Sequence, residues 1–154
     1  MSDWLKSRLT GSTPSAMPEV VRRFYTTDTT LSRDSIVVDG KSWLVDASEE
    51  QVVRLFEVAD PDVQGCLLTY RASLKSEDLT GRAFLEMWCR LPGRGEFFSR
   101  GLSQPLRGNT DWTSHETPFR LKKGQLPDLI KLNLAIEGRG KVWIKDVELL
   151  KTPK

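Results

Sequence analysis

Residues 80–149 are a succession of short runs in which apolar and polar side chains alternate, separated by glycine, proline, asparagine and aspartate. Successive side chains of a β-strand point to opposite faces of a sheet, so such a run predicts a strand with one buried face. The breaks between the runs carry residues typical of tight turns. The segment therefore predicts an antiparallel β-sandwich, and the side chains on its solvent faces become the candidate functional residues.

The alternating pattern begins near residue 35. An Asp39-Gly40 pair between two apolar runs is a hairpin signal, and further turns are expected at residues 74–81 and 91–96. No segment after residue 33 has the helical period of a crossover connection, which argues against a parallel α/β fold. Nine short strands favour an all-β, two-sheet antiparallel β-sandwich of jelly-roll type. The expected strands are 35–38, 42–47, 51–59, 65–75, 81–91, 95–101, 112–121, 128–137 and 141–150.

The first 33 residues differ from the rest because they include the linker-like stretch LTGSTPSAMP. Two short helices are compatible with this segment, one with Asp3 as its N-cap and one with Pro18 in its first turn. The stretch around residues 20–25 is equally compatible with a strand at the edge of the sandwich. We expect a short irregular or helical segment or linker in residues 1–33 and a β-sandwich domain in residues 34–154.

Length, composition and charge exclude several classes of protein. The chain has 154 residues, of which 38% are hydrophobic and 29% charged, as in one globular domain rather than a disordered chain. The net charge of +2, from 23 basic and 21 acidic residues, argues against a dedicated nucleic-acid-binding protein. No run of 18 apolar residues predicts a membrane span, and the N-terminus lacks the apolar stretch of a signal peptide. We expect a cytoplasmic protein, or an extracellular one if the sequence is a fragment of a longer secreted chain.

Three motifs in the second half of the chain occur together: a Gly-x-Ala strand at Gly81–Ala83, a Leu-x-Gly-x-Thr-Asp-Trp turn at Leu106–Trp112, and a closing strand at Gly138–Val147. Over about residues 64–150 the chain resembles bacterial carbohydrate-binding-module-like domains with the galactose-binding-like jelly-roll fold. The resemblance implies a non-catalytic accessory domain that binds carbohydrate, with Trp112 and Trp143 as structural anchors. The family commonly has two acidic residues before the final valine. Here the first of them is Lys145, which argues against a metal role at that position.

A candidate ligand-binding surface comes from the faces of three expected strands, 65–75, 81–91 and 128–137. In each strand one face is uniformly apolar and the other is polar or mixed. Aromatic rings stack on the apolar faces of sugar rings, while polar groups hydrogen-bond the hydroxyls, and binding sites combine both kinds of group. If the strands share one sheet, the mixed faces form a site of Arg71, Phe84, Glu86, Trp88, Arg90 and Asn133. The alternative is that a loop or the N-terminal segment covers the aromatic residues as a second small core.

No cofactor is expected, and the single histidine, His115, excludes a histidine-rich metal site. A structural calcium held by Asp146 with acidic residues near 49–50 and 60–62 is an alternative hypothesis, since calcium takes six to eight oxygen ligands. Otherwise we expect Asp146 to tie the last strand to a neighbouring loop. Asp111 is expected to cap its turn.

An enzyme is not expected. Ser114 and His115 are neighbours on a strand and point to opposite faces, so they form no nucleophile–base pair, and we expect His115 to be a hydrogen-bonded, partly buried side chain. Glu86 and Glu116 are the remaining candidate pair for glycoside hydrolysis, which requires two facing carboxyl groups with one raised pKa. The alternative to carbohydrate binding is a protein-interaction or regulatory domain that uses the same face for a protein partner.

Cys66 and Cys89 both have the inward register on strands expected to form a hairpin, so their sulfurs are expected to lie near each other. No zinc, haem or CxxC spacing is present. We expect two reduced thiols that pack as small apolar side chains. A disulfide between them would indicate an oxidising compartment.

Overall fold

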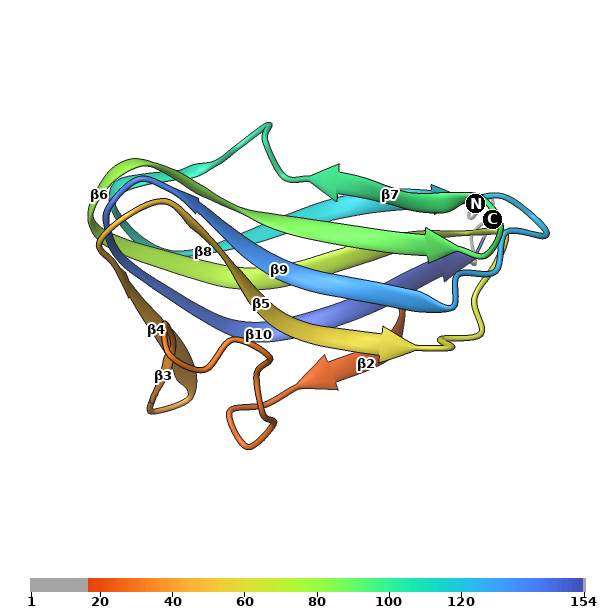
Figure 1. Cartoon of the computed structure of the whole chain (residues 1–154), viewed down its shortest axis with the longest axis horizontal. Coiled ribbons are helices and arrows are strands. Elements are labelled where there is room, and N and C mark those ends of the chain that lie inside the picture. Colours follow the sequence, from red (N-terminus) through yellow and green to blue (C-terminus); the bar gives the residue numbers. More distant parts are fainter. Residues whose placement is uncertain (1–16, 154) are drawn as a thin grey trace, which may run out of the picture.

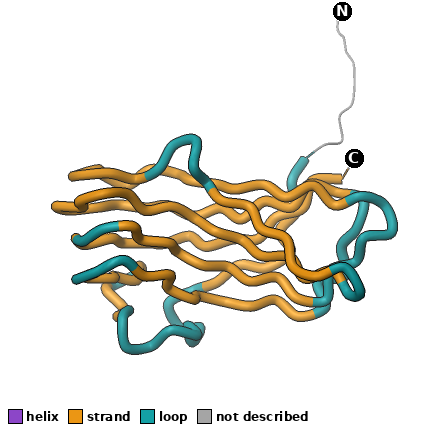
Figure 2. The backbone as a smooth tube through the Cα atoms, turned by 45° about the horizontal axis from the view of Figure 1, so that its top comes forward, coloured by secondary structure: helices purple, strands orange, loops and turns teal. Residues whose placement is uncertain are grey.

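A computed structural model describes residues 17–153, which contain strands and no helix (Figure 2). The all-β prediction is confirmed. The strands are β2 (Glu19–Phe24), β3 (Val37–Asp39), β4 (Ser42–Ala47), β5 (Gln51–Ala59), β6 (Cys66–Leu91), β7 (Gly95–Arg100), β8 (Leu106–Leu121), β9 (Leu129–Glu137) and β10 (Gly140–Pro153).

The strands form one antiparallel sheet that is folded over on itself into two layers (Figure 1). Sheet I contains β8, residues 66–77 of β6, and β10, with β4 and β2 along the far edge of β10 and β3 outside β4. Sheet II contains β7, residues 82–91 of β6, β9 and β5. The β6 strand therefore belongs to both layers of the sandwich.

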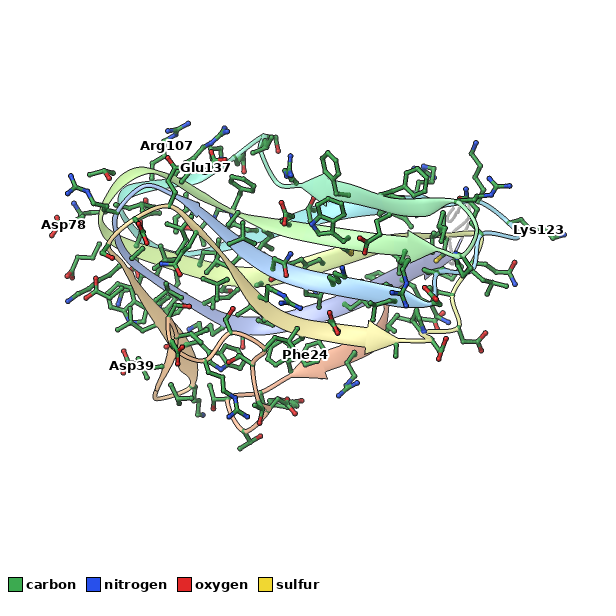
Figure 3. The ribbon with its side chains drawn as sticks, viewed as in Figure 1. Phe24, Asp39, Asp78, Arg107, Lys123 and Glu137 are labelled. Carbon is green, nitrogen blue, oxygen red and sulfur yellow. The ribbon has the colours of Figure 1, made fainter. Side chains whose placement is uncertain are left out.

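The passage of β6 between the layers is a bend at residues 78–81, where Asp78 and Gly81 have φ values of 52° and 72°. The turn from β9 to β10 passes from sheet II to sheet I at the same end of the sandwich. There the N–H of Thr80 donates to the carbonyl oxygen of Arg139 at 2.8 Å. Figure 3 shows Asp78 and Glu137 at this end and Lys123 at the other.

The sequence predicts two strands separated by a turn where the structure has the single strand β6. The physical reason is that β8 pairs with β6 on both sides of the bend, Ser76 lying opposite Thr110 and Ala83 opposite Leu106. The ladder is irregular through the bend but continues across it.

The core fills the space between the two sheets. Leu68, Tyr70 and Leu74 point inward from the first half of β6, and Leu85 and Met87 point inward from the second half; each is at most 1% exposed. The inward sets predicted by alternation are therefore the buried ones.

The segment before residue 33 contributes a strand, β2, which pairs with β10. Phe24 at its end stacks on Phe56 of β5 with ring centroids 4.1 Å apart and lies in the core. Of the two alternatives for this stretch, the structure contains the edge strand, and Pro18 begins no helix. The helix expected at Asp3 falls outside the described residues.

Cys66 and Cys89 lie on the two halves of β6, and both are buried in the core. Burial, together with the neighbouring Cys66 thiol, raises the pKa of Cys89 to about 12. Both residues therefore have the predicted inward register, and at neutral pH Cys89 is an uncharged thiol.

Candidate functional site

The outer face of sheet II carries most of the residues predicted for the site. Residues that pair across the strands of an antiparallel sheet lie side by side on one face, so the register defines rows of neighbours. One row has Phe98 (β7), Trp88 (β6) and Lys131 (β9). The next row has Arg100 (β7), Glu86 (β6), Asn133 (β9) and Arg54 (β5).

Glu86 is the centre of this face, although it is only 5% exposed. Its Oε1 accepts hydrogen bonds from Trp88 Nε1 at 2.9 Å and Asn133 Nδ2 at 3.1 Å, and its Oε2 accepts one from Arg100 Nε at 2.8 Å. A buried carboxylate is tolerated when charged and polar donors satisfy it in this way. Glu86 therefore holds three neighbouring side chains in fixed positions.

Burial alone would raise the pKa of Glu86, but the hydrogen bonds from Arg100, Trp88 and Asn133 outweigh it and lower the pKa. Glu86 is ionised at neutral pH, whereas a general acid needs a raised pKa. Glu116 lies opposite Arg71 on β8, in sheet I. The two glutamates are on different layers and form no catalytic pair.

Two aromatic rings lie side by side above this carboxylate. The rings of Trp88 and Phe98 have centroids 5.1 Å apart and are tilted by 48° to each other. The guanidinium carbon of Arg100 lies 4.2 Å from the Phe98 ring centroid, a cation–π contact. Phe98 is 51% exposed, so one face of the pair is open to solvent.

The face is hollowed on both sides of Glu86. A hollow of about 310 Å³ is lined by Trp88, Lys131 and Asn133, and a neighbouring one of about 370 Å³ by Phe84, Arg100 and Ala135. Both are shallow, and Glu86 and Val52 line each of them. The two hollows adjoin at Glu86 and Val52, and Trp88 is the member of the aromatic pair that lines one of them.

Three of the predicted site residues need correction or refinement. Phe84 is on this face but only 2% exposed, with the Arg82 guanidinium 5.4 Å from its ring centroid, so it offers no ring to a ligand. Arg71 is on the outer face of sheet I, since its half of β6 belongs to the other layer. Arg90 is on the predicted face but is held by Asp128, with Nε 2.9 Å from Oδ1.

The structure adds Phe98, Arg100 and Lys131 to the site. Alternation at residues 95–100 could have predicted that Phe98 and Arg100 share one face of β7. What the sequence does not show is that β7 pairs with the second half of β6.

The two tryptophans predicted as anchors lie on the outer face of sheet I and are half-buried. Trp143 Nε1 donates to Asp39 Oδ2 at 2.9 Å, which ties the β3–β4 hairpin to β10. The ring of Trp112 lies 4.2 Å from the ammonium of Lys145. Asp111 Oδ1 accepts from the N–H of Trp112 at 2.7 Å, but residues 106–112, predicted as a turn, belong to β8, so Asp111 caps no turn.

Two other expectations differ from the structure. Asp146 lies at a β-bulge, and its carboxylate has no hydrogen bond to a described residue, so it ties no loop to β10. The prediction for His115 is confirmed in part: the ring is partly buried and has a hydrogen bond with the backbone of Gln104, but its Nε2 atom is buried without a partner among residues 17–153. Within the same residues no three acidic, histidine or cysteine side chains converge on a point that would hold a metal ion.

Several solved structures with a similar fold are carbohydrate-binding modules. The xylan-binding domain CBM22-1 of Xyn10C from Paenibacillus barcinonensis superposes with a TM-score of 0.56 at 10% identity, covering 92% of this chain and 99% of that one. A CBM4 structure gives a TM-score of 0.54 at 8% identity over 79% and 76% of the two chains. The CBM22-1–GH10 modules of Clostridium thermocellum Xyn10B, complexed with xylohexaose, give 0.55 at 13% identity over 84% of this chain and 28% of that one.

The sequence matches no protein-family model and no curated protein. The structural similarities establish the fold: the described part of this chain is a β-sandwich similar to that of carbohydrate-binding modules, the fold that the sequence resemblance implied. The described residues contain no helix long and apolar enough to cross a bilayer.

Proposed function

We propose that the chain is a non-catalytic module that binds carbohydrate on the outer face of sheet II. The observation that carries this proposal is the Glu86 cluster, which fixes Trp88, Arg100 and Asn133 around one buried carboxylate. The exposed Phe98 ring, with the half-buried Trp88 ring tilted against it, provides an apolar surface for the C–H face of a sugar. Arg100 and Lys131 provide donors for its hydroxyl groups, and the Asn133 amide provides a donor and an acceptor; Lys131 Nζ also pairs with Glu96 Oε2 at 2.8 Å.

The binding surface is organised before a ligand arrives. The Trp88 indole is held by its hydrogen bond to Glu86, and Phe98 is held between Trp88 and Arg100. Fixing side chains in the free protein reduces the entropy lost on binding. Glu86 itself has no oxygen free of protein donors, so its role is to position the residues that contact the sugar.

Calorimetric titration with xylohexaose tests the proposal first, since one similar structure contains that ligand, and mannan- and β-glucan-derived oligosaccharides follow. Phe98→Ala and Trp88→Ala are expected to weaken binding at least tenfold, about 1.4 kcal/mol or more. Phe97→Ala is the matched control, because Phe97 is 42% exposed but pairs with Cys89 and has the opposite register on β7.

Equal binding by wild type, Phe98→Ala and Trp88→Ala would contradict the proposed site. No binding of any saccharide, combined with a stable dimer that depends on Phe98, would favour the protein-interaction function instead. Light scattering on the eluted protein measures that dimer directly.

A further inference from the structure

A larger hollow lies on the outer face of sheet I, on the layer opposite the proposed sugar-binding face. Its volume is about 640 Å³, compared with about 370 and 310 Å³ for the two hollows on sheet II. Sites for small molecules generally have volumes of about 300–1,000 Å³. The hollow is therefore large enough for a ligand of one or two sugar rings.

Three rows of side chains across β10, β6 and β8 explain the hollow. The outer rows carry long side chains, with Glu148, Arg71 and Glu116 in one and Trp143 and Lys75 in the other. In the row between them, Ser73 lies between Ser114 on β8 and Lys145 on β10, and the Lys145 ammonium is turned to the Trp112 ring, 4.2 Å from its centroid. Two short side chains between rows of long ones leave a trough with hydroxyl groups on its floor.

The edge of β10 opens the trough at one end. β4 pairs with residues 140–144 and β2 with residues 147–151, so residues 145 and 146 have no strand partner on that edge. Through this gap the trough continues to Phe24, Tyr25 and Lys41. Tyr25 is 58% exposed and presents an open ring at the entrance.

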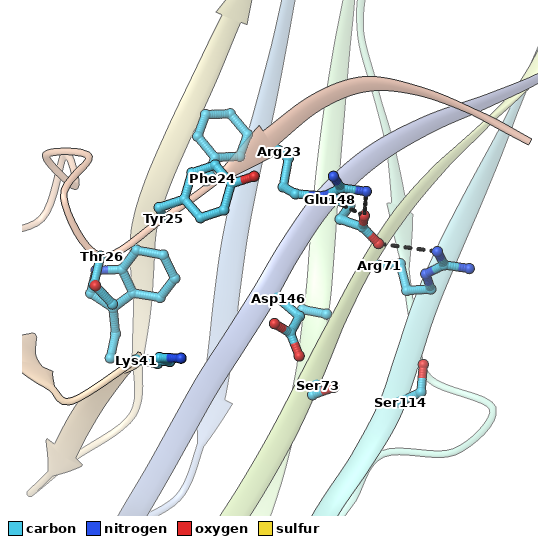
Figure 4. Close-up of a pocket in the computed structure, with 12 residues that line it drawn as sticks. Arg23, Phe24, Tyr25, Thr26, Lys41, Arg71, Ser73, Ser114, Asp146 and Glu148 are labelled. Carbon is cyan, nitrogen blue, oxygen red and sulfur yellow. Dashed lines mark hydrogen bonds and ion pairs between the residues drawn. The ribbon is translucent and has the colours of Figure 1, made fainter.

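Asp146 adopts a strained backbone conformation at the same gap. Its φ is 54°, inside β10, whereas the other non-glycine residues of the described part with positive φ, Asp60, Asp62 and Asp78, lie in a loop or at the bend of β6. The left-handed conformation costs a non-glycine residue about 1–2 kcal/mol, and such strain is concentrated at functional sites. Here the bulge directs the carboxylate into the hollow (Figure 4).

The charges around the hollow divide into a satisfied group and an unsatisfied pair. Arg23 Nε and Arg71 Nη2 donate to the two oxygens of Glu148, at 2.8 and 3.0 Å (Figure 4). Lys41 and Asp146 instead point toward each other across the hollow, and no hydrogen bond or ion pair joins either to a described residue (Figure 4).

This pattern discriminates between classes of ligand. A phosphate or sulfate needs several free cations, and Glu148 neutralises both arginines. A divalent cation needs more than the single free carboxylate, and Lys41 repels it. A hydrophobic ligand would desolvate the unpaired Asp146 and Lys41 without compensation. A neutral polyhydroxylated ring satisfies the unpaired side chains, because its hydroxyl groups donate to Asp146 and accept from Lys41 and from the two serines of the trough.

We propose that the hollow between Ser73, Ser114, Asp146 and Lys41 is a second carbohydrate site, specific for one or two neutral sugar rings stacked on Tyr25. The site stands on its own residues and does not depend on the site of sheet II. It lies on the opposite layer of the sandwich, so the module presents two separate sugar-binding surfaces.

Amide NMR spectra of the ¹⁵N-labelled full chain, titrated with the methyl pyranosides of xylose, glucose, galactose and mannose, test this site. At least one of these sugars is expected to shift the amides of residues 73, 114 and 146 together. Asp146→Asn is expected to weaken that response at least about tenfold, since a charged hydrogen-bond acceptor is lost. Asparagine tolerates the left-handed conformation, so the variant keeps the bulge.

Asp78→Asn is the matched control, because Asp78 is exposed, has a φ of 52° and lies at the bend of β6. It should leave the titration unchanged, while Ser114→Tyr should abolish it by filling the trough.

The two groups of amides make the outcomes distinguishable. Shifts confined to residues 84–98 and 131–135 would overturn the second site and leave the proposed function standing. Shifts confined to residues 73, 114 and 146 would support the second site while contradicting the sheet II site. Two further results would overturn the second site. One is a shift of these amides on titration with the free amino acid glycine but not with the sugars. The other is an equal effect of Asp146→Asn and Asp78→Asn on the sugar titration.

Discussion

Glu86 is a buried carboxylate on an outer face of the sandwich, and three side chains donate to it. Glu86→Gln replaces acceptor lone pairs by an amide donor that faces Arg100 and Trp88. We expect a loss of ~1–3 kcal/mol in the free energy of unfolding at pH 7, measured by urea denaturation. Glu116→Gln, an exposed change on β8, is the control and should alter stability little.

The same carboxylate gives a pH dependence with a defined sign. The folded pKa of Glu86 is lowered from its ordinary value of 4.5, so the folded state favours the ionised form. Its stabilising contribution is present above pH 4.5 and is lost as the pH falls through the folded pKa. The difference in stability between wild type and Glu86→Gln should therefore shrink in acid. A difference that persists unchanged at low pH would contradict the account of this cluster.

His115 gives a second pH-dependent prediction. Burial lowers its pKa below 6.5, and a hydrogen bond involving the backbone of Gln104 only partly offsets this. Below pH 6.5 the unfolded chain therefore binds a proton that the folded chain does not, and stability falls by at most about 1.4 kcal/mol per pH unit. The chain has one histidine, so its ring signals in NMR are unambiguous. A titration midpoint at or above 6.5 would contradict the prediction.

Among the elements, the bend of β6 depends on glycine. A Cβ at Gly81 would collide with the carbonyl oxygen of Glu137, and its φ of 72° is left-handed. Gly81→Ala is expected to lower the free energy of unfolding by more than about 3 kcal/mol, since backbone must move as well as adopt a strained conformation.

Gly93→Ala is the control for the bend, because Gly93 has a φ of +77° but nothing within 4 Å of an added Cβ. It should cost about 1 kcal/mol from the backbone conformation alone. If urea denaturation gave equal losses in the free energy of unfolding for Gly81→Ala and Gly93→Ala, the close approach of Gly81 to the Glu137 carbonyl oxygen would be unimportant.

The sequence predicted the strands well and the layers poorly. β4 and β5 have the bounds that alternation predicts, because each strand has one apolar face. Alternation cannot say which layer a strand joins. Arg71 and Trp88 have the outward register on the same strand, yet the bend places them on opposite outer faces. Phe98 was missed for a related reason, since its proximity to Trp88 depends on a pairing between strands.

At the scale of the whole molecule, β2 belongs to the packed sandwich. Phe24 is 4% exposed and stacks on Phe56, which also meets Trp43 edge-on at 5.6 Å between centroids. Phe24→Ala should therefore cost about 3–5 kcal/mol in the free energy of unfolding. Val20→Ala, on the same strand but 47% exposed, should cost far less. Similar values for both would mean that β2 does not pack as part of the core.

We propose above that the folded module binds sugar through the outer face of sheet II. A glycan-array screen of purified wild-type protein beside Phe98→Ala and Phe97→Ala tests it most directly. We expect wild type and Phe97→Ala to bind the same set of glycans and Phe98→Ala to lose them. Glycan binding that is equally strong in all three folded proteins, or absent from folded wild type, would contradict it.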